Sequence, residues 1–375
     1  MITSQFVKEP YRLFFPLGTL LLLCGILLWV PLIWTGESYP VELHRYLMLN
    51  GFTGCFIGGF LMTAVPKFSQ TESARVLEVA TFATITMMGV AVAHLVDSRF
   101  IYLISSMQPA FLLFFLFRRI TKRKVNPPYS FVFIFVGLFM WILSGLLSCF
   151  IDQESFKYLH YEGAIACIIL GVGSRLIPGI LGHVEIVAAQ RASYERPVSI
   201  IKTVPLKFAL LGLAFIVSYF LGEERGMPLR SLVVIIVGVF YWKLWKAPKE
   251  KTALTWCIWF SSWMIALSFI LKSFWTEGLI HIGHSFFING IVLLSFLIAT
   301  RVLQSHGPQD KNLENKKVLY VFTGLVFLAA ATRVSAFLMP DHYLKHLAYA
   351  SIVLSFAVLI WSTKYLRFVL SVPGK

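Results

Sequence analysis

The sequence predicts an all-α integral membrane protein. Three observations support this fold class: the composition, a series of long apolar segments and an uneven distribution of basic residues. Hydrophobic residues make up 58% of the 375-residue chain and charged residues only 14%, whereas an ordinary soluble domain has roughly 45–50% and about 25%. A soluble globular protein is therefore excluded. We expect twelve transmembrane helices in a single polytopic domain, residues 1–375, with the lipid bilayer as its main partner.

Twelve apolar segments are long enough to cross a bilayer, because about 20 helical residues span about 30 Å of hydrocarbon. The predicted spans are residues 13–35, 43–65, 79–96, 100–117, 129–151, 159–181, 205–222, 229–245, 253–271, 279–300, 318–339 and 343–363. The longest gap, 182–204, is too short for a separate domain, so a site must be formed by helix faces and helix ends. The first span is too long for a signal peptide and lacks a cleavage motif, so we interpret it as a retained anchor.

Basic residues are concentrated on one side of these spans. If the amino terminus is cytoplasmic, 24 of the 33 Lys and Arg residues fall on the cytoplasmic side and eight on the outer side, with Arg175 inside a span. The positive-inside rule predicts this asymmetry for an even number of spans with both termini in the cytoplasm. The net charge of +15 thus reflects topology. We interpret the basic run from Arg118 to Lys124 as membrane-flanking, and we expect no nucleic-acid partner.

Histidines gather at the opposite, outer boundary of the predicted spans. Seven of the nine lie there: His44, His94, His160, His281, His284, His342 and His346. The pairs His281/His284 and His342/His346 have helical spacings of three and four, so each pair could share one metal ion. Imidazole is a ligand for copper, zinc and iron, and two imidazoles on facing helices are the usual way in which a helix bundle holds a non-covalent haem. We therefore predict metal or haem ligation by this set. The alternative for each histidine is hydrogen bonding at the membrane interface.

Other charged residues fall near these two boundaries. Arg45, Arg99 and Arg333 lie on the outer side and are candidates for binding haem propionates. Glu162 is placed to orient or protonate a group beside the histidines, or it faces the outer water. On the cytoplasmic side, Arg175, Arg301, His183 and His306 form either a second polar site for an anion or a set of interfacial side chains that reach the headgroups.

The second, sixth and tenth spans resemble one another. Each starts with a histidine (His44, His160, His284) and continues through small residues. A period near one third of the chain suggests three units of four helices, and two six-helix halves are the alternative. The glycines themselves need only a packing role, because pairs such as Gly54 and Gly58 let helices approach closely.

The cysteines exclude several chemistries. All five lie singly in apolar runs without a C-x-x-C pair, which argues against a disulfide, a thiolate metal site and covalent c-type haem. No nucleophile triad or phosphate-binding loop is present. Any redox activity must therefore come from a bound cofactor.

Two motifs resemble the NnrS family. HRYLMLNGF (residues 44–52) followed by GFLMTAVPKF (residues 59–68) is similar to that family's H-x-H-E-M-L-F-G-F followed by G-F-L-L-T-A-V-P-N-W. The tenth span adds His284, then Thr-Arg at Arg301, then His306 and Gly307. With length and span number, the resemblance covers nearly the whole chain. NnrS proteins are multi-pass bacterial inner-membrane proteins that contain haem and copper and are linked to nitric oxide and denitrification.

The resemblance implies non-covalent haem b, with copper as a possible second cofactor, nitric oxide as a small ligand and a role in nitrosative stress. His44, His284, Arg301 and His306 match the family motifs, and with His160 the first two form the predicted haem-ligand set. The family's second histidine, its glutamate and its tryptophan are here Tyr46, Leu47 and Phe68. Because leucine cannot ligate a metal, the haem assignment is firmer than the copper assignment.

A transporter of metal, haem or a small solute is the alternative function, since twelve spans in repeats are a common transporter plan. Against it, buried acidic residues are nearly absent from the spans, and Pro109 and Pro178 are the only interior candidates for a broken helix near the midplane. A membrane scaffold without a cofactor is a third interpretation. The sequence names no electron donor.

Overall fold

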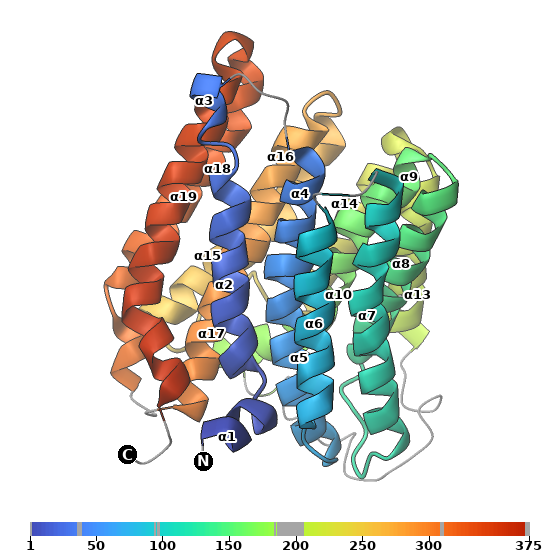
Figure 1. Ribbon diagram of the computed structural model, residues 1–375, viewed down its shortest axis with the longest axis vertical. Helices are drawn as coiled ribbons and strands as arrows, with labels where there is room; N and C mark the ends of the chain where they lie inside the picture. The colour runs from blue at the N-terminus through green and yellow to red at the C-terminus, as the bar shows by residue number, and fades with distance from the viewer. Residues whose placement is uncertain are drawn as a thin grey trace.

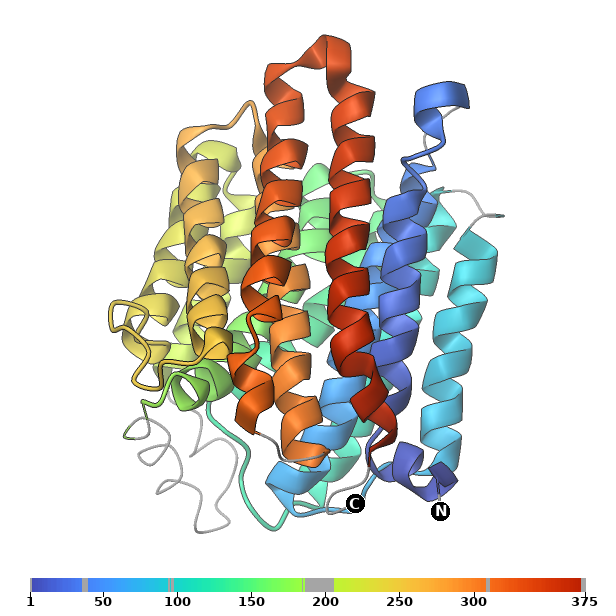
Figure 2. The same cartoon turned by 90° about the vertical axis from the view of Figure 1, so that its left-hand side faces the viewer.

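The computed structural model describes residues 2–35, 40–93, 95, 98–183, 185, 206–307 and 311–371. These residues form a bundle of helices that run along its long axis (Figure 1), and no strand occurs among them. Both termini lie at the same end of the bundle (Figures 1 and 2). This placement fits an even number of membrane crossings.

Within the described ranges, ten helical segments are long and apolar enough to cross a membrane: Tyr11–Thr35, Val41–Ser69, Val76–Ala93, Arg99–Thr121, Phe131–Phe150, Glu154–Ile180, Ala253–Phe274, Leu279–His306, Val318–Leu338 and Pro340–Leu370. Each overlaps one predicted span. A multi-pass membrane protein is therefore supported.

The predicted count of twelve spans is not confirmed, because two of the predicted spans form weaker helices. Residues 205–222 contain α13 (Leu206–Val217) and the short 3-10 helix η3 (Ser218–Phe220). Residues 229–245 contain the end of α14 (Glu223–Ile236) and η4 (Val237–Tyr241). The helices α13 and η3 together are too short to cross a bilayer. The first two turns of α14 carry Glu223, Glu224, Arg225 and Arg230, which leaves too few apolar residues to span a bilayer.

The other helices of the described residues make up the rest of the bundle, including its centre. In chain order they are α1 (Ile2–Lys8), α2 (Tyr11–Leu27), α3 (Leu32–Thr35), α4 (Val41–Tyr46), η1 (Leu47–Thr53), α5 (Gly54–Ser69), α6 (Val76–Ala93), α7 (Ser98–Thr121), α8 (Phe131–Phe150), α9 (Glu154–Tyr158), η2 (Leu159–Gly163), α10 (Ala164–Ile180), α15 (Ala253–Phe274), α16 (Leu279–Ser285), η5 (Phe286–Val292), α17 (Leu293–His306), η6 (Lys311–Asn315), α18 (Val318–Ser335), η7 (Ala336–Leu338), η8 (Pro340–His342), α19 (Tyr343–Tyr365) and η9 (Leu366–Leu370). The short helices α4, α9 and α16 lie toward the end of the bundle that is away from the termini (Figure 1).

Three continuous helices form the centre of the bundle: α4–η1–α5, α9–η2–α10 and α16–η5–α17. Their apolar stretches are 78%, 67% and 72% buried, against at most 56% for the other seven candidate spans. They are the second, sixth and tenth spans of the sequence, whose likeness suggested an internal repeat. We call them the three central helices.

Each central helix contains a π-helical segment, respectively η1, η2 and η5. These segments hold a polar residue followed by glycine: Asn50–Gly51, Glu162–Gly163 and Asn289–Gly290. A fourth π segment, η4, ends α14. Because π segments are rare in helices and are common at functional sites, their recurrence in the three central helices supports a repeat of three units.

The glycines of the first central helix permit close packing, as the sequence suggests. A Cβ atom on Gly54 would lie 2.0 Å from Gln108 Oε1, and one on Gly58 would lie 2.3 Å from the Phe82 ring. Side chains at these positions would push α6 and α7 away. The packing role predicted for Gly54 and Gly58 is thus confirmed.

Candidate functional site: two cavities on the three central helices

A cavity of about 670 Å³ lies between the three central helices at the end away from the termini. Its wall includes His44 and Phe52 from the first central helix, Tyr161 from the second, and His284 and Phe287 from the third. The volume is within the range of about 300–1,000 Å³ that is usual for small-molecule and cofactor pockets. We call this space the histidine cavity.

His44 and His284 are held in the same way. Nδ1 of His44 lies 2.9 Å from the Gly25 carbonyl oxygen, and Nδ1 of His284 lies 2.7 Å from the Ile280 carbonyl oxygen. The indole nitrogen of Trp29 also lies 3.1 Å from Nδ1 of His44. In the tautomer with hydrogen on Nδ1, each ring donates to a backbone carbonyl and keeps Nε2 for a ligand. This arrangement is typical of metal-bound histidine. For His44 this tautomer excludes the hydrogen bond that the Trp29 indole N–H donates to an unprotonated Nδ1.

Arginines from two elements line the same cavity. Arg45 follows His44 in α4 and Arg333 lies in the last turn of α18. Arg45 forms a 2.9 Å ion pair with Glu42, of which both side chains are part-exposed, and an arginine so placed can exchange partners at little cost. Arg333 donates to His281 Nδ1 at 3.0 Å. Two guanidinium groups therefore reach a cavity that also holds two imidazoles.

A buried ion pair forms another part of the wall. Lys272 of α15 pairs closely with Glu162 of η2, and the two side chains are 2% and 4% exposed. The Tyr219 hydroxyl donates to the other Glu162 oxygen at 3.2 Å. Glu162 therefore does not face the outer water. It is fixed at the cavity wall by a cation and a phenol.

His160 is not among the residues that line the cavity. Its Nε2 lies 2.9 Å from Ser105 Oγ, and its Nδ1 lies 3.1 Å from the Trp141 carbonyl oxygen and 3.3 Å from Ser144 Oγ. The ring is fully buried. Both nitrogens thus have protein partners, which favours a structural role for His160 over the predicted ligation.

The π segments explain why His160 differs from the other two histidines. His44 precedes its π segment by three residues and His284 by two, whereas His160 lies inside η2. The position in the second central helix that matches His44 and His284 falls at Phe156 or Lys157, and Lys157 does line the cavity.

The other predicted ligands are dispersed. His281 lies beside Arg333, as described above. His346 has its Nδ1 within 3.1 Å of Ser335 Oγ and 3.2 Å of the Thr332 carbonyl oxygen. His342 is exposed in η8, and Arg99 is exposed at the start of α7; neither lines the cavity. His94 lies outside the described residues.

The donor set fits haem better than copper. Two imidazoles with backbone-anchored Nδ1 atoms, apolar walls and two arginines match a non-covalent haem and its propionates. No group of three or more His, Cys, Asp or Glu side chains arranged for a metal ion occurs among the described residues. Met48, one helical turn after His44, adds a thioether to the cavity wall.

A second cavity, of about 310 Å³, lies between the same three helices at the end that carries the termini. Lys67 of α5, Arg175 of α10, and Arg301 and His306 of α17 line it, together with Tyr11 of α2. We call it the arginine cavity. It contains three of the four residues of the predicted cytoplasmic polar site, and His183 is not among its lining residues.

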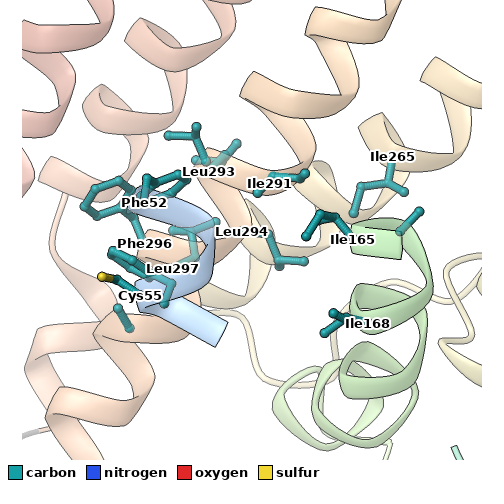
Figure 3. Packing of buried hydrophobic residues seen from close by; sticks show 14 of the residues in the cluster. Phe52, Cys55, Ile165, Ile168, Ile265, Ile291, Leu293, Leu294, Phe296 and Leu297 are labelled. Carbon is teal, nitrogen blue, oxygen red and sulfur yellow. The ribbon is translucent and has the colours of Figure 1, made fainter. Parts of the chain in front are cut away.

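An apolar layer separates the two cavities. Figure 3 shows part of it: Phe52 and Cys55 from the first central helix, Ile165 and Ile168 from the second, and Leu294 and Leu297 from the third. Thr53 lines the histidine cavity and Phe60 the arginine cavity. Since Phe60 lies seven residues after Thr53, the layer is about 10 Å thick along this helix.

A comparison with protein-family models matches residues 5–372 to the NnrS protein family. The chain belongs to the NnrS family. The resemblance carried by the span motifs is thereby confirmed over nearly the whole chain. A comparison with curated proteins gives no match.

Sequence reasoning missed part of this NnrS protein's cavity wall. Lys272 is assigned from the sequence to the outer boundary as a topology signal, but it lines the histidine cavity beside Glu162. Its position after the apolar run SFIL was the available signal, because a lysine that ends an apolar span needs an acidic partner if it is buried. Tyr219, in the weak seventh span, offered no such signal.

Proposed function

We propose that this NnrS protein is a b-type haem protein of the bacterial inner membrane that binds nitric oxide and acts in the response to nitrosative stress. In this proposal, His44 and His284 are the haem ligands, and Arg45 and Arg333 bind the propionates. Haem held there supplies an iron that binds nitric oxide. Family membership supports the link to nitric oxide, and the ten apolar helices support the membrane location.

One observation carries the haem assignment. Imidazoles from two separate helices line one cavity, and each has Nδ1 beside a backbone carbonyl and no hydrogen bond at Nε2. Neutral imidazole is the form that binds metal. The surrounding Ile26, Phe52 and Phe287 side chains contribute apolar surface to the pocket. Arg45 and Arg333 also line it and would supply charge for the propionates.

The test is the haem content and absorption spectrum of the full chain, purified from haem-replete cells, for wild type and for the variants His44→Ala and His284→Ala. We expect a Soret band in the wild type, an altered and weaker band in each single variant, and no band in the double variant. Addition of nitric oxide under anaerobic conditions should shift the wild-type band.

His342→Gln is the matched control, because His342 is an exposed histidine that does not line the cavity. It should keep the wild-type spectrum. A colourless wild type, or a double variant with an unchanged spectrum and haem content, would contradict the proposal. Metal analysis of the same samples tests copper, for which we assign no set of ligands.

A transporter is the second candidate function. The observation that favours it is the presence of two cavities on the same three helices, with an apolar layer between them and a π segment in each helix. Many transporters place opposing access sites on such irregular helices. A colourless, metal-free preparation that moves a solute across vesicle membranes would favour transport over haem binding.

A further inference from the structure

We propose that the arginine cavity is a binding site for an oxyanion group, such as phosphate, carboxylate or nitrate. This site is separate from the histidine cavity and does not depend on haem binding. The proposal rests on three features: the cationic groups that converge from three helices, a described lining that contains no carboxylate, and a buried hydroxyl that makes no hydrogen bond by geometry.

Cationic side chains reach the cavity from all three central helices. Lys67 lies in the last turn of α5, Arg175 in α10 and Arg301 in α17. The Lys67 side chain is 52% exposed and the Arg301 side chain 43% exposed, so the cavity opens to solvent at this end. Guanidinium groups present paired N–H donors that match the oxygens of carboxylate and phosphate.

The described residues that line this cavity include three cations and no carboxylate. The cations are Lys67, Arg175 and Arg301. Glu9 accepts from Arg12 at 2.8 Å and from Lys67 at 3.3 Å, and it also lies 2.9 Å from His306 Nδ1. Glu314 pairs with Arg301, but neither carboxylate is part of the lining. A lining that carries basic groups without a carboxylate favours an anionic occupant.

A buried hydroxyl faces this cavity without a hydrogen bond. Tyr11 is 0% exposed, lines the cavity, and has no partner for its hydroxyl oxygen. Glu9 acts on this hydroxyl both electrostatically and as an acceptor at long range, but no contact of the hydroxyl meets the geometry of a hydrogen bond. An unsatisfied buried hydroxyl is costly, and an anion oxygen in the cavity would accept from it.

The cavity also limits the size and nature of the occupant. Its volume of about 310 Å³ is near the lower limit for ligand pockets, about 300 Å³. Phe60, Leu176 and Ile298 contribute apolar surface to the same cavity. The site therefore suits one oxyanion group with a small apolar neighbour. A free cytoplasmic anion and the headgroup of an anionic lipid both present this chemistry.

The test is phosphate binding to the full chain in detergent after lipid removal, measured with radiolabelled inorganic phosphate and by the thermal unfolding midpoint. Total ionic strength is held constant with chloride. We expect saturable binding and a rise of the midpoint in wild type. The double variant Lys67→Gln/Arg175→Gln should weaken phosphate binding at least about tenfold, because hydrogen bonds from charged groups to the anion are lost.

Arg75→Gln is the matched control, since Arg75 pairs with Glu72 at the same end of the molecule and does not line the cavity. It should bind phosphate like wild type. Tyr11→Phe keeps the packing and removes only the hydroxyl, so it should weaken phosphate binding severalfold. This variant tests the site even if the double variant does not fold. The proposal would be overturned if wild type shows no saturable phosphate binding. It would also be overturned if wild type, Tyr11→Phe and the double variant all bind phosphate with equal affinity.

Two lipid arms identify the source of the oxyanion. In nanodiscs of neutral phosphatidylcholine, phosphate should raise the unfolding midpoint as in detergent. If the phosphate effect is lost when anionic phosphatidylglycerol is included, a lipid headgroup occupies the site. If the effect persists in both membranes, the occupant is a free anion. Either result supports the site, whereas no phosphate effect in any arm contradicts it.

Discussion

The histidine cavity and the arginine cavity share three helices but differ in how their charges are balanced. At the histidine cavity, Lys272 is paired with Glu162, Arg45 with Glu42, and Lys157 with Glu154 at 2.8 Å. Two imidazoles there keep a free Nε2. At the arginine cavity, the described lining carries cations and no carboxylate, and the Tyr11 hydroxyl makes no hydrogen bond by geometry. This difference underlies the two proposals, a metal-ligating site at one end of the three central helices and an anion-binding site at the other.

The largest expected effect tests how firmly the histidine cavity is built. Glu162→Gln leaves Lys272 buried without a counter-charge, and such a change costs about 3–5 kcal/mol. The free energy of unfolding in denaturant measures this loss. The variant Glu162→Gln with Lys272→Gln should recover much of it, because two neutral amides can hydrogen-bond to each other and to Tyr219.

The arginine cavity supplies the contrasting pair. Lys67 and Glu9 lie 3.3 Å apart with the Lys67 side chain half exposed, so Lys67→Gln should cost less than about 1 kcal/mol. If Glu162→Gln and Lys67→Gln change the free energy of unfolding equally, the contrast between a fixed and an adaptable charged cavity is wrong.

The second prediction separates His160 from the two proposed haem ligands. His160→Ala removes the buried partner of Ser105 and of the Trp141 carbonyl, and an unsatisfied buried group costs about 1–3 kcal/mol. We expect lower stability with unchanged haem content per folded chain. His44→Ala should do the reverse, with a lower haem content and the haem-free protein nearly as stable as before. If both variants lose haem, His160 is also a haem ligand.

The fold could be predicted from the sequence because membrane crossing depends on length and polarity alone. Ten of the twelve predicted spans meet that criterion in the structure. The likeness of the second, sixth and tenth spans also indicated the central helices. The two exceptions show the limit of the method, since the charged start of α14 shortens its apolar part.

The site could be predicted only in part. His44 and His284 open spans on the same side, so their proximity followed from topology. The side chain of His160 could not be placed, because π segments change the register between a residue's number and the face on which it lies. Pairing of Glu162 with Lys272 joins residues 110 apart in the chain, and no local pattern encodes such a contact.

The third prediction concerns the arginines of the histidine cavity. Arg45→Gln and Arg333→Gln should each weaken haem affinity about tenfold, or about 1.4 kcal/mol, because each removes one proposed propionate partner. Titration of haem into haem-free protein measures this. Arg99→Gln is the control, since Arg99 is exposed and does not line the cavity. If only Arg99→Gln weakens haem affinity tenfold, the propionates are not bound by Arg45 and Arg333.

The last prediction concerns a pH dependence beside the arginine cavity. Burial alone would raise the pKa of Glu9, but hydrogen bonds from His306 and Arg12 outweigh it and lower the pKa from 4.5 to about 2. Because the folded pKa lies below the unfolded value, Glu9 contributes stability above about pH 4.5 that is lost as the pH falls toward 2. Since the group is half-buried, we expect about 1–2 kcal/mol at pH 7.

Glu9→Gln measures this contribution directly. At pH 7 the variant should unfold at a lower temperature than wild type, and the difference should fall to less than about half by pH 3, where the unfolded wild type gains a proton that the folded state does not. Glu72→Gln removes a fully exposed carboxylate 2.8 Å from Arg75 and should show no difference at either pH. A gap between Glu9→Gln and wild type that does not change with pH would mean that the glutamine disturbs packing, and the charge balance assigned to the arginine cavity would then need revision.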